Sequence, residues 1–277
     1  MLYARWNRLT QSAGAAGELV VRHSLGTSGR HLTEMQPGFG EVSWYGSAFK
    51  FPGPLDSGAY LMTKGSNGLP RQPIEILIEV KNRRLVLYPT HKEAHQILHK
   101  AALAQLAEPT RAVLPVLVCR RAHYRLFSMA RDLGWLIHQT HVQYLLPPKV
   151  SSRSLAEEAR AELGLNDLLF IDPRNPPRIV KFFEETIPAR SSGAALRWKI
   201  TAPLIREFSA ELRQEKAELT SVVRLDKIRE LRQRTEAECV KHGLSFEGNW
   251  SLPDRTDPAT LEEDEFEGYE DPWAHLD

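Results

Sequence analysis

The chain of 277 residues is 42% hydrophobic and 26% charged, and its formal net charge is +1. This composition is typical of globular proteins and excludes a fibrous or wholly disordered chain. No apolar run reaches the roughly 18 to 20 residues that a membrane span needs, and no apolar leader lies near residue 1. We therefore expect a cytoplasmic protein without membrane contact. The two cysteines, Cys119 and Cys239, lie far apart, so neither a disulfide scaffold nor a cysteine zinc site is predicted.

Charge is distributed unevenly along the chain. Residues 254–277 carry ten acidic side chains and one basic one, which leaves 35 basic and 25 acidic side chains in residues 1–253. A basic body is typical of proteins that bind polyanions, although ordinary solvated surface charge explains it equally well. The acidic tail, residues 254–277, has few aliphatic side chains, so we expect it to be disordered until a partner binds it.

Strands and helices alternate over the first half of the chain. Up to residue 90 the expected elements are a helix over 3–25 and strands near 41–45, 48–51, 59–63, 74–84 and 85–88. From residue 91 they are a helix over 91–107, a strand over 113–118, a helix over 122–133 and strands over 135–137 and 142–146. This alternation predicts an α/β fold.

A proline-rich and serine-rich stretch at 147–152 is the best candidate for a linker. It divides the chain into a first domain, residues 1–148, a mostly helical accessory region, residues 149–253, and the acidic tail. Within the accessory region we expect a helix over 155–163, a strand over 168–171, a helix over 179–186 and a loop at 191–193. Thr201 is expected to cap a helical region that runs to about residue 242, with a break near 220–223.

The stretch 74–84 reads as a strand with one apolar and one charged face. Period-two alternation places Ile74, Ile76, Ile78 and Val80 on one face, and Glu75, Leu77, Glu79 and Lys81 on the other. Glu79 and Lys81 are about 7 Å apart along the strand and point into the same volume. They form either a chemical site or a surface ion pair.

Two further acids are expected near this pair. In a hairpin centred between residues 68 and 69, paired residue numbers sum to 137, which places Asp56 opposite Lys81. Pro70 and Pro73 permit a shift of one or two residues. Glu18 shares a helix face with apolar neighbours, and a carboxylate there needs a cation close by.

These four residues resemble the motif of the PD-(D/E)xK nuclease superfamily, which includes many restriction endonucleases and archaeal Holliday-junction resolvases. The motif appears as Pro54-Leu55-Asp56, a gap, and then Glu79-Val80-Lys81; the Gly17-Glu18 helix is also similar to the nuclease-related NERD group. The resemblance covers roughly residues 10–146. It implies a restriction endonuclease-like α/β/α core with a mixed sheet, joined to a mostly helical C-terminal region. Because Leu55 splits the Pro-Asp pair, Glu41 is a rival for the first acid.

The resemblance also implies a reaction and its residues. Asp56, Glu79 and the carbonyl of Val80 would bind Mg²⁺ or Mn²⁺, with Glu18 as an outer or second-metal ligand. Lys81 would activate the attacking water and stabilise charge in the transition state. The implied function is a Mg²⁺-dependent endonuclease that hydrolyses DNA in restriction, repair or anti-phage defence, and double-strand cutting implies a homodimer.

Seven basic residues near the motif are expected either to contact phosphate groups or to lie on the solvent-exposed surface. They are Arg83, Arg84, Lys92, Lys100, Arg120, Arg121 and Arg125. His91, His95 and His99 share one helix face. Because no further residue of suitable spacing completes a zinc ligand set, we expect these histidines to form a solvent-exposed stripe that faces phosphate rather than a zinc site. Gln96 on the same helix is a weaker candidate, as support for the lysine.

Two other interpretations remain open. In the first, Glu79 and Lys81 form a structural ion pair, Asp56 is an ordinary turn aspartate, and the protein is a non-catalytic nucleic-acid-binding or assembly subunit. In the second, the acidic tail is regulatory and either covers a basic groove as a polyanion mimic or docks a basic protein partner. DNA is the expected partner of the basic body in each case.

Overall fold

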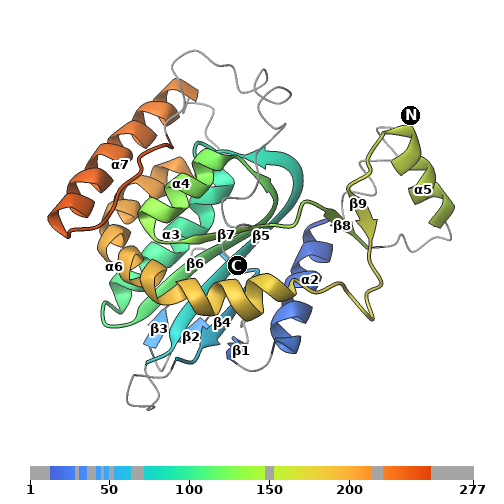
Figure 1. Ribbon diagram of the computed structural model, residues 1–277, viewed down its shortest axis with the longest axis horizontal. Coiled ribbons are helices and arrows are strands. Elements are labelled where there is room, and N and C mark those ends of the chain that lie inside the picture. The colour runs from blue at the N-terminus through green and yellow to red at the C-terminus, as the bar shows by residue number, and fades with distance from the viewer. Residues whose placement is uncertain are drawn as a thin grey trace.

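The structure, a computed structural model, describes residues 13–28, 31–35, 42–44, 47–49, 53–63, 72–146, 153–213 and 221–250. It is an α/β fold in which helices cover both faces of a mixed five-stranded sheet (Figure 1). The predicted fold class is therefore confirmed at this level. Glu41, the predicted linker at 147–152 and the acidic tail lie outside the described residues. Among those that are described, no helix is long and apolar enough to cross a membrane.

The central sheet is antiparallel on one side of β5 and parallel on the other. In spatial order its strands are β1 (Leu32–Glu34), β4 (Ser57–Leu61), β5 (Ile74–Leu87), β6 (Ala112–Ala122) and β7 (Leu136–Gln139). Strands β1, β4 and β5 pair antiparallel, whereas β5, β6 and β7 pair parallel. Two smaller pairs are β2 (Val42–Trp44) with β3 (Ser47–Phe49), and β8 (Gln143–Leu145) with β9 (Leu168–Phe170).

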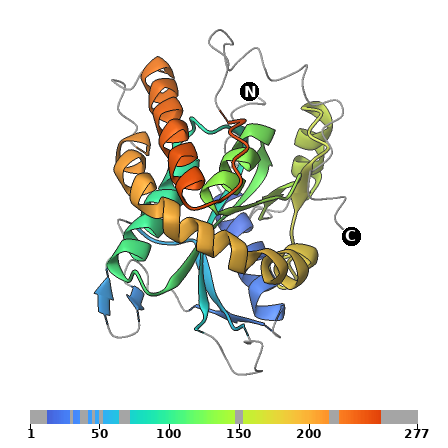
Figure 2. The ribbon, with the colours of Figure 1, turned by 60° about the vertical axis from the view of Figure 1, so that its left-hand side comes forward.

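The helices, apart from α5 (Arg153–Glu162), form a layer on each face of the sheet, and α5 lies beside β9 (Figure 1). The others are α2 (Ala13–Thr27), α3 (Lys92–Ala107), α4 (Tyr124–Leu133), the π-helical turn η1 (Phe182–Thr186), α6 (Ile187–Leu212) and α7 (Ser221–Lys241). One core lies between the sheet, α2 and η1, and a second lies between the sheet, α3, α4 and most of α6. Figure 2 shows α7 lying against α6 on the outside.

The alternation predicted for the strand at 74–84 is confirmed. Ile76 and Ile78 contribute to the core beneath α2, while Leu77 between them contributes to the core beneath α3. Both faces are covered by helices, so Glu75 and Glu79 are buried as well. The strand is longer than predicted because β5 continues to Leu87, with a shift in its register against β6 between Lys81 and Val86.

Helix α2 approaches β5 unusually closely at Gly17. A Cβ atom there would lie 2.7 Å from Cβ of Asn82 and 2.9 Å from Cγ1 of Val80. Asn82 cannot move easily, since its Nδ2 donates to the carbonyls of Ala13 and Tyr144 at 2.7 and 2.6 Å. The glycine therefore sets the distance between the helix and the strand.

Replacing Gly17 by alanine should destabilise the chain by about 1 to 3 kcal/mol, because a buried methyl group has no space to occupy. Urea denaturation of the purified variant measures this change. Gly14→Ala is the matched control: it lies on the same helix with nothing within 4 Å of its Cβ position, so alanine there should stabilise by about 1 kcal/mol. Equal effects at the two positions would contradict the close packing at Gly17.

Two expectations for the accessory region are wrong. The loop predicted at 191–193 and the cap predicted at Thr201 both lie inside the continuous helix α6. The Oγ1 of Thr201 donates to the carbonyl of Leu133 at 2.6 Å. Burial of the apolar side of α6, including Trp198, outweighs the local turn preference of the Ser-Ser-Gly sequence.

The first domain and the accessory region share side-chain packing. Helix α6 contacts α3 and β6, and Trp198, Ile205 and Phe208 belong to the same core as Ile97 and Leu98. Strand β9 also pairs with β8 across the predicted linker. The boundary at residue 148 stays a prediction, but residues on both sides of it build one hydrophobic core.

Candidate functional site

The hairpin of β4 and β5 determines where Asp56 lies. Ser57 pairs with Ile78 and Leu61 with Ile74, so paired numbers sum to 135 rather than the predicted 137. This register moves Asp56 beside Glu79 and Val80 instead of opposite Lys81. The backbone N–H of Val80 donates to Asp56 Oδ2 at 2.7 Å. A loop with two prolines does not specify hairpin register, which explains the shift of two residues.

Two lysines hold the carboxylate of Glu79. Its Oε1 lies 2.8 Å from Nζ of Lys81, and its Oε2 lies 2.8 Å from Nζ of Lys100. Lys100 also donates to the carbonyl of Pro54 at 2.6 Å, which links α3 to the turn before β4. The side chain of Lys100 is buried against Glu79, so a solvated surface position for it is wrong, whereas its contact with phosphate stays a prediction.

Asp56 is the electrostatically perturbed member of the group. Burial, followed by the charges of Glu79 and Glu18, raises the pKa of Asp56 to about 6. The hydrogen bond from Val80 N and the charge of Lys81 act in the opposite direction but do not cancel the rise. Loss of hydration on burial is therefore the main reason that the charged form of Asp56 is disfavoured, and the charge of Glu79 adds to it.

Glu18 lies near these residues but has its own cation. Its Oε2 is 2.8 Å from Nη2 of Arg22, which also donates to the backbone carbonyl of Asp56 at 3.2 Å. The Glu18 side chain is 31% exposed, so it sits at the edge of the apolar face rather than within it. The expected cationic partner of Glu18 is present, and it is an arginine one helical turn away.

A cavity of about 280 Å³ opens beside these side chains. Its lining consists of Gly53, Pro54, Asp56, Glu79, Gln96, Lys100 and Arg213. Gln96 and Lys100 reach it from consecutive turns of α3, and support of Lys81 by Gln96 stays a prediction. Gly53 has a φ of +130°, a conformation that other residues rarely adopt, so a side chain at 53 would strain the turn that leads to Asp56.

The donor set suits a hard divalent cation only in part. Among the described residues, no group of three or more His, Cys, Asp or Glu side chains is arranged to hold a metal ion. Two carboxylates, Asp56 and Glu79, do border the cavity, and Mg²⁺ often takes one or two protein carboxylates and completes its shell with water. A cation between them would favour the charged form of Asp56, which burial and then the charge of Glu79 disfavour, provided that Lys81 or Lys100 moves away from Glu79.

The histidines of α3 do not form the wet stripe that was predicted. His95 and His99 are buried, with His95 Nε2 2.7 Å from the carbonyl of Pro89 and His99 Nδ1 3.2 Å from Oγ of Ser209. Burial lowers the pKa of both to about 4, so they are neutral at physiological pH. The packing of α6 over α3 covers this side of the helix, which sequence periodicity did not show.

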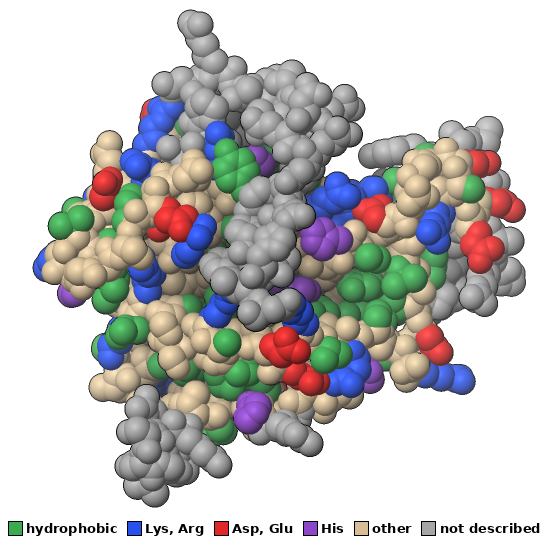
Figure 3. Space-filling view, viewed as in Figure 1, with side chains coloured by type: hydrophobic (Ala, Val, Ile, Leu, Met, Phe, Trp, Pro, Cys, Tyr) green, Lys and Arg blue, Asp and Glu red, His purple; other side chains and the backbone are tan. Residues whose placement is uncertain are grey.

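The remaining basic residues have mixed surroundings. Arg84 and Arg120 both pair with Asp167, just before β9. Arg83 is exposed and lies 3.4 Å from Glu93. Arg125 lies over the ring of Tyr124, and Lys92 and Arg121 are half-buried. On the face seen in Figure 3 the basic side chains are interspersed with acidic ones rather than gathered in one stripe.

Glu75 is the other acid on the Glu79 face of β5. It is buried, and its Oε1 lies 3.3 Å from Nη1 of Arg111. Burial raises the pKa of Glu75 to about 8, although Arg111 opposes the rise. Glu75 takes no part in the cavity lining and is therefore a useful comparison for Glu79.

The raised pKa of Asp56 predicts a pH-dependent stability. The folded chain binds this proton more tightly than the unfolded chain, whose Asp56 has the usual pKa of 3.8. The contribution is fully present below pH 3.8 and is lost as the pH rises through 6. Asp56→Asn removes the ionisation, so its stability relative to the natural chain should increase by up to about 3 kcal/mol between pH 4 and pH 8.

Urea denaturation at both pH values tests this expectation. Asp226→Asn is the control, since Asp226 is an exposed residue of α7 paired with Arg229. A stability difference between Asp56→Asn and the natural chain that does not change with pH would contradict the raised pKa.

Comparison of the chain with protein-family models, with curated proteins and with solved structures found no match, so the functional argument depends on these residues and their geometry.

Proposed function

We propose that the protein is an endonuclease that uses Mg²⁺ or Mn²⁺ to hydrolyse phosphodiester bonds in DNA. The observation that carries this proposal is that Asp56 and Glu79 line one cavity and that Lys81 pairs with Glu79 there. These are the acids and the lysine whose spacing resembles the PD-(D/E)xK motif. The antiparallel β1–β4–β5 arrangement followed by parallel β6 and β7 supports a restriction endonuclease-like core.

A bound divalent cation supplies charge neutralisation at the scissile phosphate and lowers the pKa of an attacking water. The chain's own groups position the other participants. Lys81, once released from Glu79, can donate hydrogen bonds from Nζ to the attacking water or to the phosphate oxygen on which negative charge develops. Lys100 bridges Glu79 and the Pro54 carbonyl and so fixes the carboxylate against the turn that holds Asp56.

The ionisation of Asp56 sets the expected pH dependence. With a pKa of about 6, Asp56 carries its charge mainly above that pH. A cation between Asp56 and Glu79 would lower this pKa, since it favours the charged form. Cleavage should therefore fall as the pH drops below 6, and a higher concentration of Mg²⁺ should move that fall to lower pH.

A second candidate function is a non-catalytic nucleic-acid-binding or assembly subunit with the same core. The observation that favours it is the pairing of two of the site's three acids within the chain: Glu79 with two lysines, and Glu18 with Arg22. Such a balanced arrangement is also a stable structural feature without a metal.

Cleavage of DNA by the purified chain separates the two candidates. Plasmid, linear and branched DNA, and RNA as a comparison, are incubated with Mg²⁺, with Mn²⁺ and with EDTA. Metal-dependent cutting of DNA supports the endonuclease. Salt-sensitive DNA binding without cleavage of any substrate contradicts the endonuclease and favours the binding subunit. Sizing of the same preparation tests the expected homodimer.

A further inference from the structure

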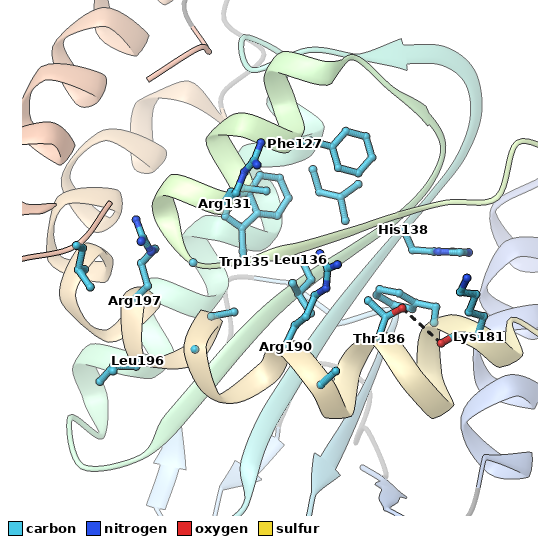
Figure 4. A pocket seen from close by; sticks show the side chains of 18 residues that line it. Phe127, Arg131, Trp135, Leu136, His138, Lys181, Thr186, Arg190, Leu196 and Arg197 are labelled. Carbon is cyan, nitrogen blue, oxygen red and sulfur yellow. Dashed lines mark hydrogen bonds between the residues drawn. The ribbon is translucent and has the colours of Figure 1, made fainter. Parts of the chain in front are cut away.

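A second and larger cavity, of about 760 Å³, shares no lining residue with the cavity beside Asp56. Its walls come from α4 and β7 on one side and from η1 and α6 on the other, and Figure 4 shows their side chains projecting toward one another. Phe127, Trp135, Leu136 and Phe182 give these walls an apolar and aromatic character. We call this cavity the β7 groove, since strand β7 forms part of it.

The β7 groove has a strongly positive lining. Arg131, Lys181, Arg190 and Arg197 line it, whereas none of the described residues that line it is acidic. Outside the lining, Arg131 pairs with Glu247, and Arg197 donates to the carbonyl of Ser245. An apolar wall combined with several cations favours an occupant that is both anionic and aromatic.

Strand β7 adds a backbone feature to the groove. It is the last strand in the order of the described sheet, and it pairs with β6 on one side. The outer side of an edge strand presents N–H and C=O groups that an extended peptide can use. The groove therefore suits a peptide segment better than a compact small molecule.

The chain itself delivers such a segment to the groove. After α7, the chain runs back along α4 (Figure 1), and Leu244 is one of the groove residues. The N–H groups of Glu247 and Gly248 and Nε1 of Trp250 all donate to Asp132, at 2.8 to 3.0 Å. Residue 250 is thus fixed beside Arg131, the neighbour of Asp132 and a part of the groove lining.

We propose that the acidic tail, residues 254–277, docks into the β7 groove of its own chain. Its ten acidic side chains complement the four cations, and Phe266, Tyr269 and Trp273 supply aromatic rings for the apolar walls. From residue 250, an extended chain spans roughly 50 Å by residue 266, which is ample to follow the groove. This proposal is independent of the nuclease proposal.

Disulfide trapping in the full chain tests the proposal. Leu196→Cys places a thiol on a side chain that lines the groove and is 61% exposed, and Gly268→Cys places its partner in the acidic tail. Val240→Cys with the same tail cysteine is the control, because Val240 is 73% exposed, lies outside the groove lining and precedes the same anchor. Both natural cysteines are buried, which raises the pKa of their thiols and slows their reaction.

Docking should make the intramolecular disulfide from residue 196 form at least about tenfold faster than that from residue 240, because it raises the local concentration of the tail. Arg190→Glu should remove most of this advantage, whereas Lys241→Glu on α7 should leave it unchanged. Equal rates at residues 196 and 240 would overturn the proposal. A fast disulfide that joins two chains would also overturn it, since the occupant would then be the tail of a second copy.

Discussion

Replacing Glu79 by glutamine should reduce metal-dependent cleavage of DNA by about 10²-fold to 10³-fold or more, because the variant loses a charged ligand and the acid that holds both lysines. The measurement is the initial rate of plasmid nicking in Mg²⁺ at pH 8. Glutamine retains the size of the side chain and accepts hydrogen bonds, so the fold around Lys81 and Lys100 should persist.

Glu75→Gln is the matched control for this variant. It is the same substitution, on the same face of β5, at a buried glutamate whose partner is Arg111 instead of the cavity lysines. Its cleavage rate should stay within about twofold of the natural chain, as expected for a group that does not touch the reacting atoms. Equal loss of activity in the two variants would indicate a general effect of substitutions in β5 and contradict the assigned site.

Lys81→Met separates catalysis from binding at the same site. The methionine keeps most of the length of the side chain but removes the ammonium that would act on the nucleophile. We expect cleavage to fall by a similar factor while DNA affinity at fixed salt changes by less than about threefold, since one contact is a small part of the total. Cleavage at the natural rate would exclude Lys81 from the reaction.

Replacing Asp132 by alanine should destabilise the chain by about 3 to 5 kcal/mol, the largest stability effect that we expect for a single residue. Asp132 on α4 is 1% exposed, and its two oxygens accept from the N–H groups of Glu247 and Gly248 and from Nε1 of Trp250. Alanine would leave three donors without partners, two of them in buried surroundings. Trp250, itself fully buried, would lose its polar contact.

Urea denaturation followed by tryptophan fluorescence measures this effect. Asp226→Ala is the control, because the Asp226 side chain is 62% exposed and its ion pair with Arg229 joins adjacent turns of one helix. That substitution should change stability by less than about 0.5 kcal/mol. A loss of less than about 1 kcal/mol for Asp132→Ala would show that the segment 244–250 does not depend on this anchor.

Local pattern was enough to predict much of the secondary structure. The helix predicted over 91–107 and the strand predicted over 113–118 correspond to α3 and β6. These predictions succeed because the side of an element that faces a core carries apolar residues at the period of that element. Pro115 lies within β6, paired with Leu77 of the parallel neighbour, although proline is unfavourable there. The continuous apolar run outweighed that single breaker.

Sequence reasoning missed residues whose role depends on distant partners. Lys100 was assigned to the surface, but it meets Glu79 inside the fold because α3 crosses the hairpin at that point. No sequence pattern indicated the role of Asp132, since the three groups that donate to it are more than a hundred residues away in the chain. The Gln96-Lys100 spacing of one helical turn was the signal that could have indicated the inward side of α3.

The sequence by itself determined the α/β class, the alternating faces of β5, and the set of acids and lysine that could act together. These follow from short-range geometry, because side-chain direction repeats every two residues in a strand and every 3.6 in a helix. Only the tertiary structure decided the hairpin register that moves Asp56 to Val80 and the burial of His95 and His99 under α6. It also decided the pairing of Glu79 with Lys100. Each depends on contacts between elements distant in the chain, where total packing rather than local preference sets the lowest free energy.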